Sequence, residues 1–191
     1  MRVQPIKTHP ISPSERDLLA IVDRYVTELP ERSVLAITSK IVAICEGRVR
    51  AMADVDKRTL IAEEAERYLA PDPRWGVSLT IKHDMLIATA GIDESNADGH
   101  YVLWPSDAQR SADVLREHLA LRFGRSELGV VITDSRTTPL RLGVTGVALA
   151  HSGFRALNDY VGKQDLFGRA LRMTKVNVMD ALATSAVLVM G

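Results

Sequence analysis

Two short runs of almost continuously apolar residues constrain the fold of this chain most. They are residues 33–38 (SVLAIT) and 129–133 (GVVIT), and both have the length of a strand. A strand that is covered on both faces needs no alternating polar residues, so each run predicts a buried strand. Predicted helices and strands mix along the chain without strict βαβ alternation. The sequence therefore predicts an α+β fold rather than a doubly wound parallel sheet.

Four segments have the apolar spacing or the boundary residues of helices. The first helix is expected from the Ser-Pro-Ser-Glu start at 12–15 to Leu29-Pro30, and the second over 58–69, ended by Pro71 and Pro73. The third is expected from an N-cap at Ser106 to about Phe123, with Gly124 as its stop. The last, over 173–190, is expected to be largely buried. Each limit rests on residues that start or end helices in other proteins.

Further short strands are expected at 1–6, at 77–81 and 85–89, and at 143–149. The middle pair flanks Lys82-His83-Asp84, which predicts a hairpin. Trp75 and Trp104 are isolated and are interpreted as core anchors. No repeat or obvious linker divides the chain, so residues 1–191 are interpreted as one domain, with room for a small sub-lobe around 70–105.

Charge and cysteine content exclude several classes of function. Lys and Arg number 24, as do Asp and Glu, so no long-range field attracts nucleic acid or an anionic membrane. Cys45 is the only cysteine, which excludes a disulfide or a cysteine-cluster metal site within one chain. No apolar run has the length of a signal peptide or a membrane span, which predicts a cytoplasmic protein. Neither GxGxxG nor GxxxxGK[ST] occurs, so a nucleotide would need another kind of cradle.

Two acidic loops each follow a predicted strand. The first, residues 90–96 (AGIDESN), contains Asp93 and Asn96, and the second contains Asp134 and Ser135. Carboxylate, amide and hydroxyl oxygens on tight loops suit a hard divalent cation, and Asp93 can share Mg²⁺ or Mn²⁺ with the second loop if the two loops meet. The alternative for each loop is an ordinary turn closed by its own side-chain hydrogen bonds.

Three basic residues lie in segments that suit anionic ligands. Ser39 and Lys40 come directly after the strand at 33–38, where they suit phosphate oxygens, especially if a helix begins there. Arg141 precedes Gly143, and Arg169 ends the polar loop at 162–169. Arginine offers a planar fork for a carboxylate or a phosphate. The alternative is that Lys40 is a solvated surface lysine.

In this order and spacing, these segments resemble the coenzyme F420:L-glutamate ligase family. The resemblance rests on ITSKIVAICEGRV, TAGIDESN, WPSDAQRSADVLR, GVVITDS, LRLGVTGVALAHSGF, GKQDLFGRALRMT and DALATSAVLVMG, which together extend over nearly the whole chain. It implies a two-lobed α+β fold that intertwines into a butterfly-like homodimer. It also implies a γ-glutamyl ligase that joins L-glutamate to a small-molecule carboxylate acceptor through an acyl phosphate, with GTP, Mg²⁺ or Mn²⁺, and often K⁺.

On the matching positions, the resemblance implies a role for each candidate residue. Asp93, Asp134 and Ser135 would bind the metal ion; Pro5, Ile6, Ser39, Lys40 and Asn96 would contact the nucleotide; and Lys40, Arg141 and Arg169 would offset the charge that builds up between phosphate and carboxylate.

The sequence departs from the family pattern in three places. First, Ile44 stands where family members usually carry a lysine. Second, the short acidic segment that follows LVMG in the family does not follow Gly191 in the sequence given. Third, the region between the helix at 58–69 and Trp75 is shorter than in the family. These departures keep two alternatives open, namely the same reaction on another acceptor such as a folate, and a nucleotide- or metal-binding homologue that has lost catalysis. A structural domain whose loops merely carry polar residues is the simplest further alternative.

Overall fold

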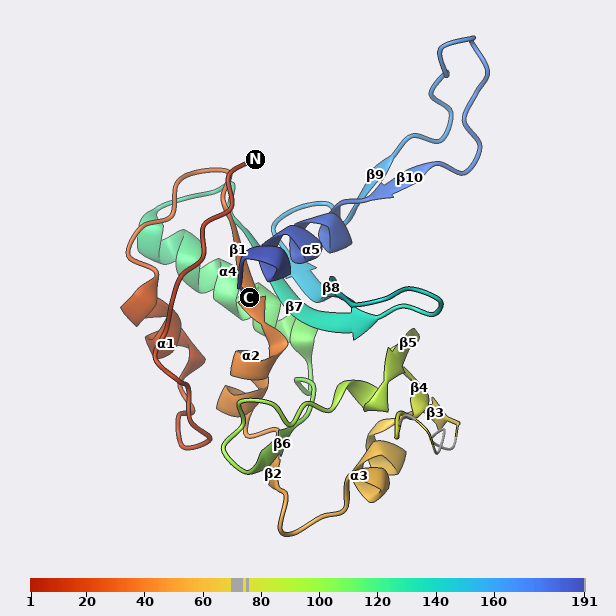
Figure 1. The fold of residues 1–191 in the computed structure, drawn as a ribbon. Helices are drawn as coiled ribbons and strands as arrows, with labels where there is room; N and C mark the ends of the chain where they lie inside the picture. Colours follow the sequence, from red (N-terminus) through yellow and green to blue (C-terminus); the bar gives the residue numbers. More distant parts are fainter. Residues whose placement is uncertain (70–73, 75, 191) are drawn as a thin grey trace.

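The computed structural model describes residues 1–69, 74 and 76–190, and its centre is a three-stranded sheet. The sheet has the order β1 (Val34–Thr38), β7 (Gly129–Thr137) and β8 (Val144–Ser152). β1 and β7 are parallel, in a register that runs from Val34 opposite Gly129 to Thr38 opposite Thr133. β7 and β8 are antiparallel. The two apolar runs of the sequence are therefore neighbouring buried strands, and the predicted α+β class is confirmed (Figure 1).

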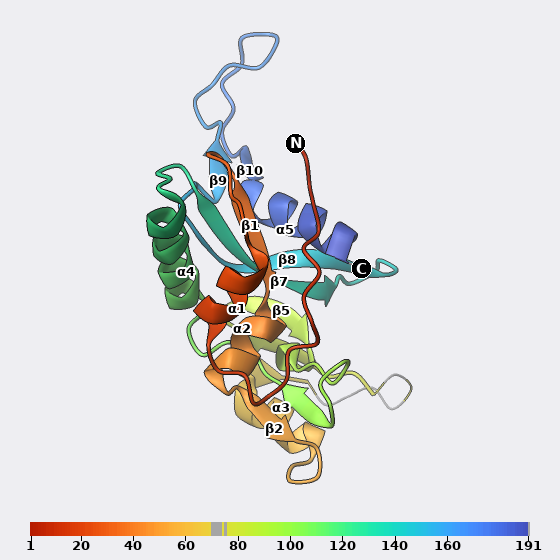
Figure 2. The same ribbon diagram turned by 90° about the vertical axis from the view of Figure 1, so that its left-hand side faces the viewer.

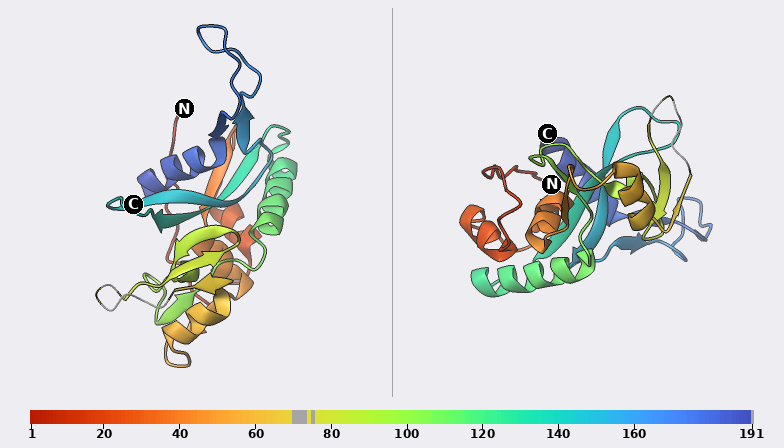
Figure 3. Two further views of the ribbon diagram at one scale, coloured as in Figure 1. Left: turned by 90° about the vertical axis from the view of Figure 1, so that its right-hand side faces the viewer. Right: turned by 90° about the horizontal axis from the view of Figure 1, so that it is seen from below.

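Helices cover both faces of this sheet. α4 (Ala108–Phe123) packs on one face together with α1 (Leu18–Tyr25) and α2 (Ser39–Glu46), and α5 (Val178–Met190) lies on the other, as Figures 2 and 3 show. Side chains alternate along a strand. Val130 and Ile132 accordingly pack with α4, whereas Val131 packs with Ala183 of α5. Burial on both faces explains why β7 needs no polar residue before Thr133.

A second group of elements lies at one end of the sheet (Figure 1). It contains the antiparallel pair β2 (Val49–Ala51) and β6 (His100–Val102), the helix α3 (Lys57–Glu64), the meander β3 (Arg67–Tyr68), β4 (Leu79–Lys82) and β5 (Met85–Ala88), and the 3₁₀ turn η1 (Thr89–Gly91). Its own apolar cluster includes Leu60, Ile92 and Leu103. The hairpin predicted around Lys82-His83-Asp84 is confirmed by the pairing of β4 with β5.

The remaining two strands form an arm. β9 (Leu157–Asp159) pairs with β10 (Lys175–Asn177), and the chain between them extends away from the rest of the molecule (Figure 1). Large apolar side chains on this arm are almost fully exposed, with Leu166 at 98% and Phe167 at 95%.

The N-terminal predictions were partly wrong. Residues 1–6 form no strand. Residues 12–15 form a separate turn, in which Ser12 N–H donates to Glu15 Oε1 over 2.8 Å, rather than the start of a helix. α1 begins only at Leu18, after Asp17 accepts from Ala20 N–H, and ends at Tyr25. The Ser-x-x-Glu pattern therefore closes on itself and leaves the capping of α1 to the next aspartate.

The other predicted helices exist with different limits. α3 ends at Glu64 because Arg67–Tyr68 pairs with β4, and Pro71 and Pro73 lie outside the described residues. α4 is capped by Asp107, because the N–H and Oγ of Ser106 both donate to Glu46. Gly124 ends α4 in the left-handed conformation, with φ of 61°, as predicted.

The last helix is shorter and more exposed than predicted. Its first residues form β10 instead, and α5 begins at Val178. Only Ala183 and Ala186 are buried, whereas Leu188 is 82% exposed. Apolar composition alone did not show that this helix has a single packed face. No helix in the described part of the chain is both long and apolar enough to span a membrane.

Candidate functional site

The candidate site begins where the parallel pairing of β1 with β7 ends. Thr38, the last residue of β1, is paired with Thr133 of β7. Ser39 and Asp134 are the next residues along these two parallel strands. Asp134 and Ser135 were predicted to lie in a loop, but they lie within β7, because they are paired with Val147 and Gly146 of β8. α2 begins at Ser39, and Thr38 Oγ accepts the N–H of Lys40 over 3.4 Å. The sequence left open whether a helix begins here, and the structure shows that α2 does.

Lys40 connects the start of α2 to the first acidic loop. Its ammonium group lies 2.7 Å from Asp93 Oδ2 and donates to the carbonyl oxygen of Ser95 over 2.7 Å. The N–H and hydroxyl of Ser95 donate to Asp93 Oδ1 over 2.7 and 2.8 Å. Burial raises the pKa of Asp93, but the hydrogen bonds from Lys40 and Ser95 outweigh it and hold the pKa below its usual value. Lys40 is thus an ion-paired residue and not a freely solvated lysine.

The backbone before Asp93 has an unusual conformation. Thr89 and Ala90 have φ of 50° and 53°, and Gly91 follows with φ of 70°. Such left-handed conformations are costly for residues with a Cβ and persist where surrounding contacts hold them. Ala90 is fully buried and donates its N–H to Thr80 Oγ1 over 2.9 Å. Asp93 then exchanges backbone hydrogen bonds with Val102, which fixes the loop against β6.

Asp134 is the more buried of the two aspartates. Its Oδ2 accepts the indole N–H of Trp104 over 2.6 Å, and its Oδ1 accepts the N–H of Ser135 over 2.8 Å. Burial and, to a smaller extent, the negative charge of Asp93 raise the pKa of Asp134 to about 6, against the opposing effects of Trp104, Ser135 and Lys40. Asp134 of β7 therefore lies close enough to the loop of Asp93 for the charge of Asp93 to act on its ionisation.

The side chains at this site suit a hard cation in their chemistry. Two carboxylates and the Ser135 hydroxyl are oxygen donors of the kind that Mg²⁺ and Mn²⁺ prefer. Each oxygen of Asp134 accepts one hydrogen bond and keeps a second lone pair. Within the described ranges, no group of three or more His, Cys, Asp or Glu side chains is placed to hold a metal ion. Any metal at this site would therefore rely on these two aspartates and on oxygens of other kinds.

The predicted nucleotide-binding residues fall in three places. Ser39 is buried at the start of α2, next to Lys40. Asn96 is exposed in the same loop as Asp93, with φ of 53°. Pro5 and Ile6 are exposed in the irregular N-terminal segment. The structure thus brings Ser39, Lys40 and Asn96 to one end of the sheet, and their role in binding a nucleotide stays a prediction.

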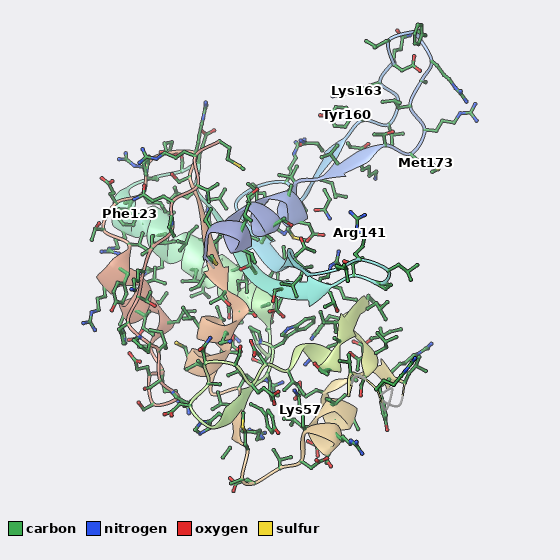
Figure 4. The ribbon with its side chains drawn as sticks, viewed as in Figure 1. Lys57, Phe123, Arg141, Tyr160, Lys163 and Met173 are labelled. Carbon is green, nitrogen blue, oxygen red and sulfur yellow. The ribbon has the colours of Figure 1, made fainter. Side chains whose placement is uncertain are left out.

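The other two predicted cations lie elsewhere. Arg141 is exposed in the connection between β7 and β8, and Arg169 is exposed in the arm between β9 and β10. Figure 4 shows Arg141 on its hairpin, and Lys163 and Met173 along the arm, away from β7. Among the contacts of the described residues, neither arginine reaches Asp93 or Asp134. Their catalytic role stays a prediction that one chain does not test.

Sequence reasoning missed two features around the site. Trp104 is a core residue, as predicted, but its N–H also binds Asp134. Glu64 accepts from both Lys82 and Arg48, at 2.6 and 2.7 Å, and the ammonium group of Lys82 lies over the Trp104 ring. Glu64 carries no signal for this cluster in the sequence, because α3 (KRTLIAEE) is rich in charged residues and the partners of Glu64 come from distant segments. Trp75 lies outside the described residues.

Ile44 has a structural role at the position where the family pattern has lysine. It is 3% exposed and packs with Ala97 and Val102, between α2 and the second group of elements. Its carbonyl oxygen accepts from Arg16 Nη1 over 3.0 Å. An isoleucine here strengthens the packing of α2 against the loop that follows Asp93.

Comparison with known proteins places this arrangement in an enzyme family of ligases. The family model F420-0:Gamma-glutamyl ligase matches residues 57–191, which is more than half of the chain. The chain belongs to the F420-0:gamma-glutamyl ligase family.

Several proteins named coenzyme F420:L-glutamate ligase are similar to the chain over most of its length. The coenzyme F420:L-glutamate ligase of Methanopyrus kandleri is 36% identical over 211 residues, covering 100% of this chain and 82% of the relative. The protein of the same name from Archaeoglobus fulgidus is 31% identical, covering 100% of this chain and 83% of the relative. That of Methanococcus maripaludis strain S2 is 31% identical, covering 97% and 74%.

Proposed function

We propose that this protein is a GTP- and metal-dependent ligase that forms a γ-glutamyl amide bond between L-glutamate and a carboxylate acceptor, coenzyme F420-0 or a related molecule. Family membership and the names of the relatives support the reaction. The observation that carries the proposal is that Trp104 donates to Asp134 of β7 while it packs against Gly91 in the loop of Asp93, whose carboxylate binds Lys40.

The reaction needs an activated acceptor, because a carboxylate is a poor electrophile. A carboxylate oxygen of the acceptor attacks the γ-phosphorus of GTP, the bond from that phosphorus to the β–γ bridging oxygen breaks, and GDP leaves. The amine of L-glutamate then attacks the acyl carbon of the acyl phosphate, inorganic phosphate leaves with the bonding electrons, and the amine loses a proton. Each step brings anionic groups together, so the protein must offset negative charge.

Lys40 and α2 are suited to offset that charge. The free N–H groups at the start of a helix favour a phosphate group, and α2 begins at Ser39, beside Lys40. We propose that Lys40 contacts the terminal phosphate, and that Asn96 and Ser39 contact the nucleotide together with Pro5 and Ile6. Arg141 and Arg169 are proposed to act on the phosphate or the carboxylate from segments that extend away from the sheet.

Asp93, Asp134 and Ser135 are proposed to hold Mg²⁺ or Mn²⁺. A divalent ion bound there would supply positive charge next to the phosphate oxygens. The desolvation of Asp134 supports this role, because a buried carboxylate beside a second carboxylate gains from a cation that neutralises both. K⁺ is part of the proposal through the family resemblance alone.

The active form is proposed to be a homodimer in which the arm contacts a second copy. The exposed Leu166 and Phe167 support it, because a soluble monomer rarely leaves such side chains uncovered together. A second copy would also supply Arg169 near a site that its own chain does not reach.

The test uses purified protein with GTP, Mn²⁺, labelled L-glutamate and either F420-0 or a folate. We expect label in the F420-0 product, and no turnover from Asp93→Asn or Asp134→Asn with the circular dichroism spectrum unchanged. Unchanged turnover in either variant would defeat the proposed site. Label in the folate product alone would assign another acceptor. Calorimetric binding of GTP without phosphate release would identify a homologue that has lost catalysis.

A further inference from the structure

Trp104 lies at the centre of the contacts behind the candidate site. It is 3% exposed, and its carbonyl oxygen accepts from Arg48 Nε over 3.1 Å. The ammonium group of Lys82 lies 5.5 Å from the centroid of its ring. Arg48 and Lys82 both bind Glu64. The tryptophan is therefore held on its backbone side and on its ring face by one cluster of charges.

The backbone of Gly91 packs directly against the Trp104 ring. A Cβ at this position would lie 2.2 Å from Trp104 Nε1 and 2.3 Å from Cε2, closer than any side chain can approach. Gly91 is two residues before Asp93, so the indole lies directly against the backbone of the first acidic loop. At the same time its N–H donates to Asp134 Oδ2 over 2.6 Å. One side chain thus contacts both Asp134 of β7 and the loop of Asp93.

From this geometry we propose that Trp104 is a positioning residue, which fixes the rotation of the Asp134 carboxylate and its separation from the loop of Asp93. Indole N–H is only a donor, so it directs one lone pair of Oδ2 and leaves the other toward the ion. The Ser135 N–H constrains Oδ1 in the same way. The inference rests on the proposed function, in which Asp134 binds the divalent ion. Groups that orient metal ligands typically change metal affinity or activity by about 10–100-fold when they are removed.

The sharpest test removes only the N–H. The chain has two tryptophans, so Trp75→Phe leaves Trp104 as the single position for a tryptophan analogue. One sample carries the isostere in which sulfur replaces the indole N–H, and the matched control carries 5-fluorotryptophan, which keeps it. Both analogues preserve the ring that packs against Gly91, whereas Trp104→Phe would combine the loss of the donor with a cavity.

Two quantities are measured. Electron paramagnetic resonance gives the Kd of Mn²⁺ in the presence of GTP. Turnover at varied Mn²⁺ concentration gives kcat and the KM for Mn²⁺. We expect the sulfur analogue to weaken Mn²⁺ binding about 10–100-fold, with the fluorinated control unchanged. The KM for Mn²⁺ should rise more than kcat falls, because excess metal compensates for a poorly oriented ligand.

Two results would overturn the inference, and they are distinguishable. If both analogues bind Mn²⁺ like the Trp75→Phe protein, the indole N–H has no positioning role, while the proposed metal site stands. If the unsubstituted protein binds no Mn²⁺ with GTP, the proposed function fails and the positioning role fails with it.

Discussion

At the scale of single residues, the buried ion cluster shows how charge holds together the second group of elements. Glu64 of α3 accepts from Lys82 of β4 and from Arg48, which precedes β2. The Lys82 side chain is only 6% exposed, so its ammonium group has lost most of its water. Burial lowers the pKa of Lys82, against the opposing effect of Glu64. A charge in such a position is tolerated because its partner is present.

Removing that partner should be costly. We expect Glu64→Gln to lower the free energy of unfolding by about 3 kcal/mol, because it leaves two poorly solvated cations without a carboxylate. Urea denaturation followed by circular dichroism measures the change. The matched control is Glu127→Gln, whose ion pair with Arg32 is exposed to solvent and should contribute little. Equal midpoints for the two variants would contradict this account of the cluster.

The same cluster predicts a pH dependence. Burial raises the pKa of Glu64, but the hydrogen bonds from Lys82 and Arg48 outweigh it and hold the pKa below the ordinary value of 4.5. A carboxylate with a lowered pKa in the folded state stabilises the protein above 4.5, and this contribution is lost as the pH falls through the lowered value. The stability difference between wild type and Glu64→Gln should therefore shrink below pH 4.5. A difference that stays constant down to pH 3 would be evidence against the lowered pKa.

At the scale of elements, the packing of α5 against β8 depends on one small residue. Thr184 of α5 donates its hydroxyl to the carbonyl oxygen of Gly146, and Asp180 accepts the N–H of Ala148 over 2.9 Å. A Cβ at Gly146 would lie 2.6 Å from the carbonyl oxygen of Ala183 and 2.7 Å from Thr184 Cα. These are backbone atoms, so they cannot move aside as a flexible side chain would. The glycine therefore sets how closely the helix approaches the strand.

We expect Gly146→Ala to destabilise the protein by about 2 kcal/mol through overpacking, and to increase amide hydrogen exchange in α5. Gly143→Ala is the control. No atom lies within 4 Å of its added Cβ, and its φ of 84° should cost only about 1 kcal/mol without affecting α5. Unchanged exchange in α5 of Gly146→Ala would show that the helix adapts to the extra methyl group.

At the scale of the whole molecule, the arm is the feature that a single chain does not explain. Its tip is ordered by Asp165, whose Oδ1 accepts the N–H groups of Phe167 and Arg169 over 2.9 Å each. This turn presents Leu166 and Phe167 to solvent. An ordered tip that exposes apolar side chains is the expected form of a contact with a second copy.

We expect light scattering after size-exclusion chromatography to give a dimer for the unsubstituted protein and a monomer for the double variant Leu166→Asp and Phe167→Asp. A charge in an apolar contact opposes association because it loses its hydration there. Leu121→Asp, at an exposed position on α4 outside the arm, should leave the dimer intact. A dimer that survives both arm substitutions would assign the contact to another surface.

Much of this architecture could be predicted from local sequence. The apolar runs at 33–38 and 129–133 predicted β1 and β7, and the turn residues around His83 predicted the β4–β5 hairpin. Gly124 marked the end of α4 because only the left-handed conformation closes that helix. The less successful predictions, at 1–6 and 173–190, depended on apolar residues whose burial is decided by distant partners.

The candidate site, too, could be predicted only in part from local sequence. The sequence by itself determined which side chains carry oxygen donors and cations, and it placed Asp93 and Asp134 each at the end of a β-rich run. Only the tertiary structure decided that Lys40 binds Asp93, that Trp104 donates to Asp134, and that Arg169 lies out on the arm. The physical reason is that composition and short-range pattern act within a few residues. The electrostatic partners of a buried group are chosen by strand pairing and packing between segments that are far apart in the chain.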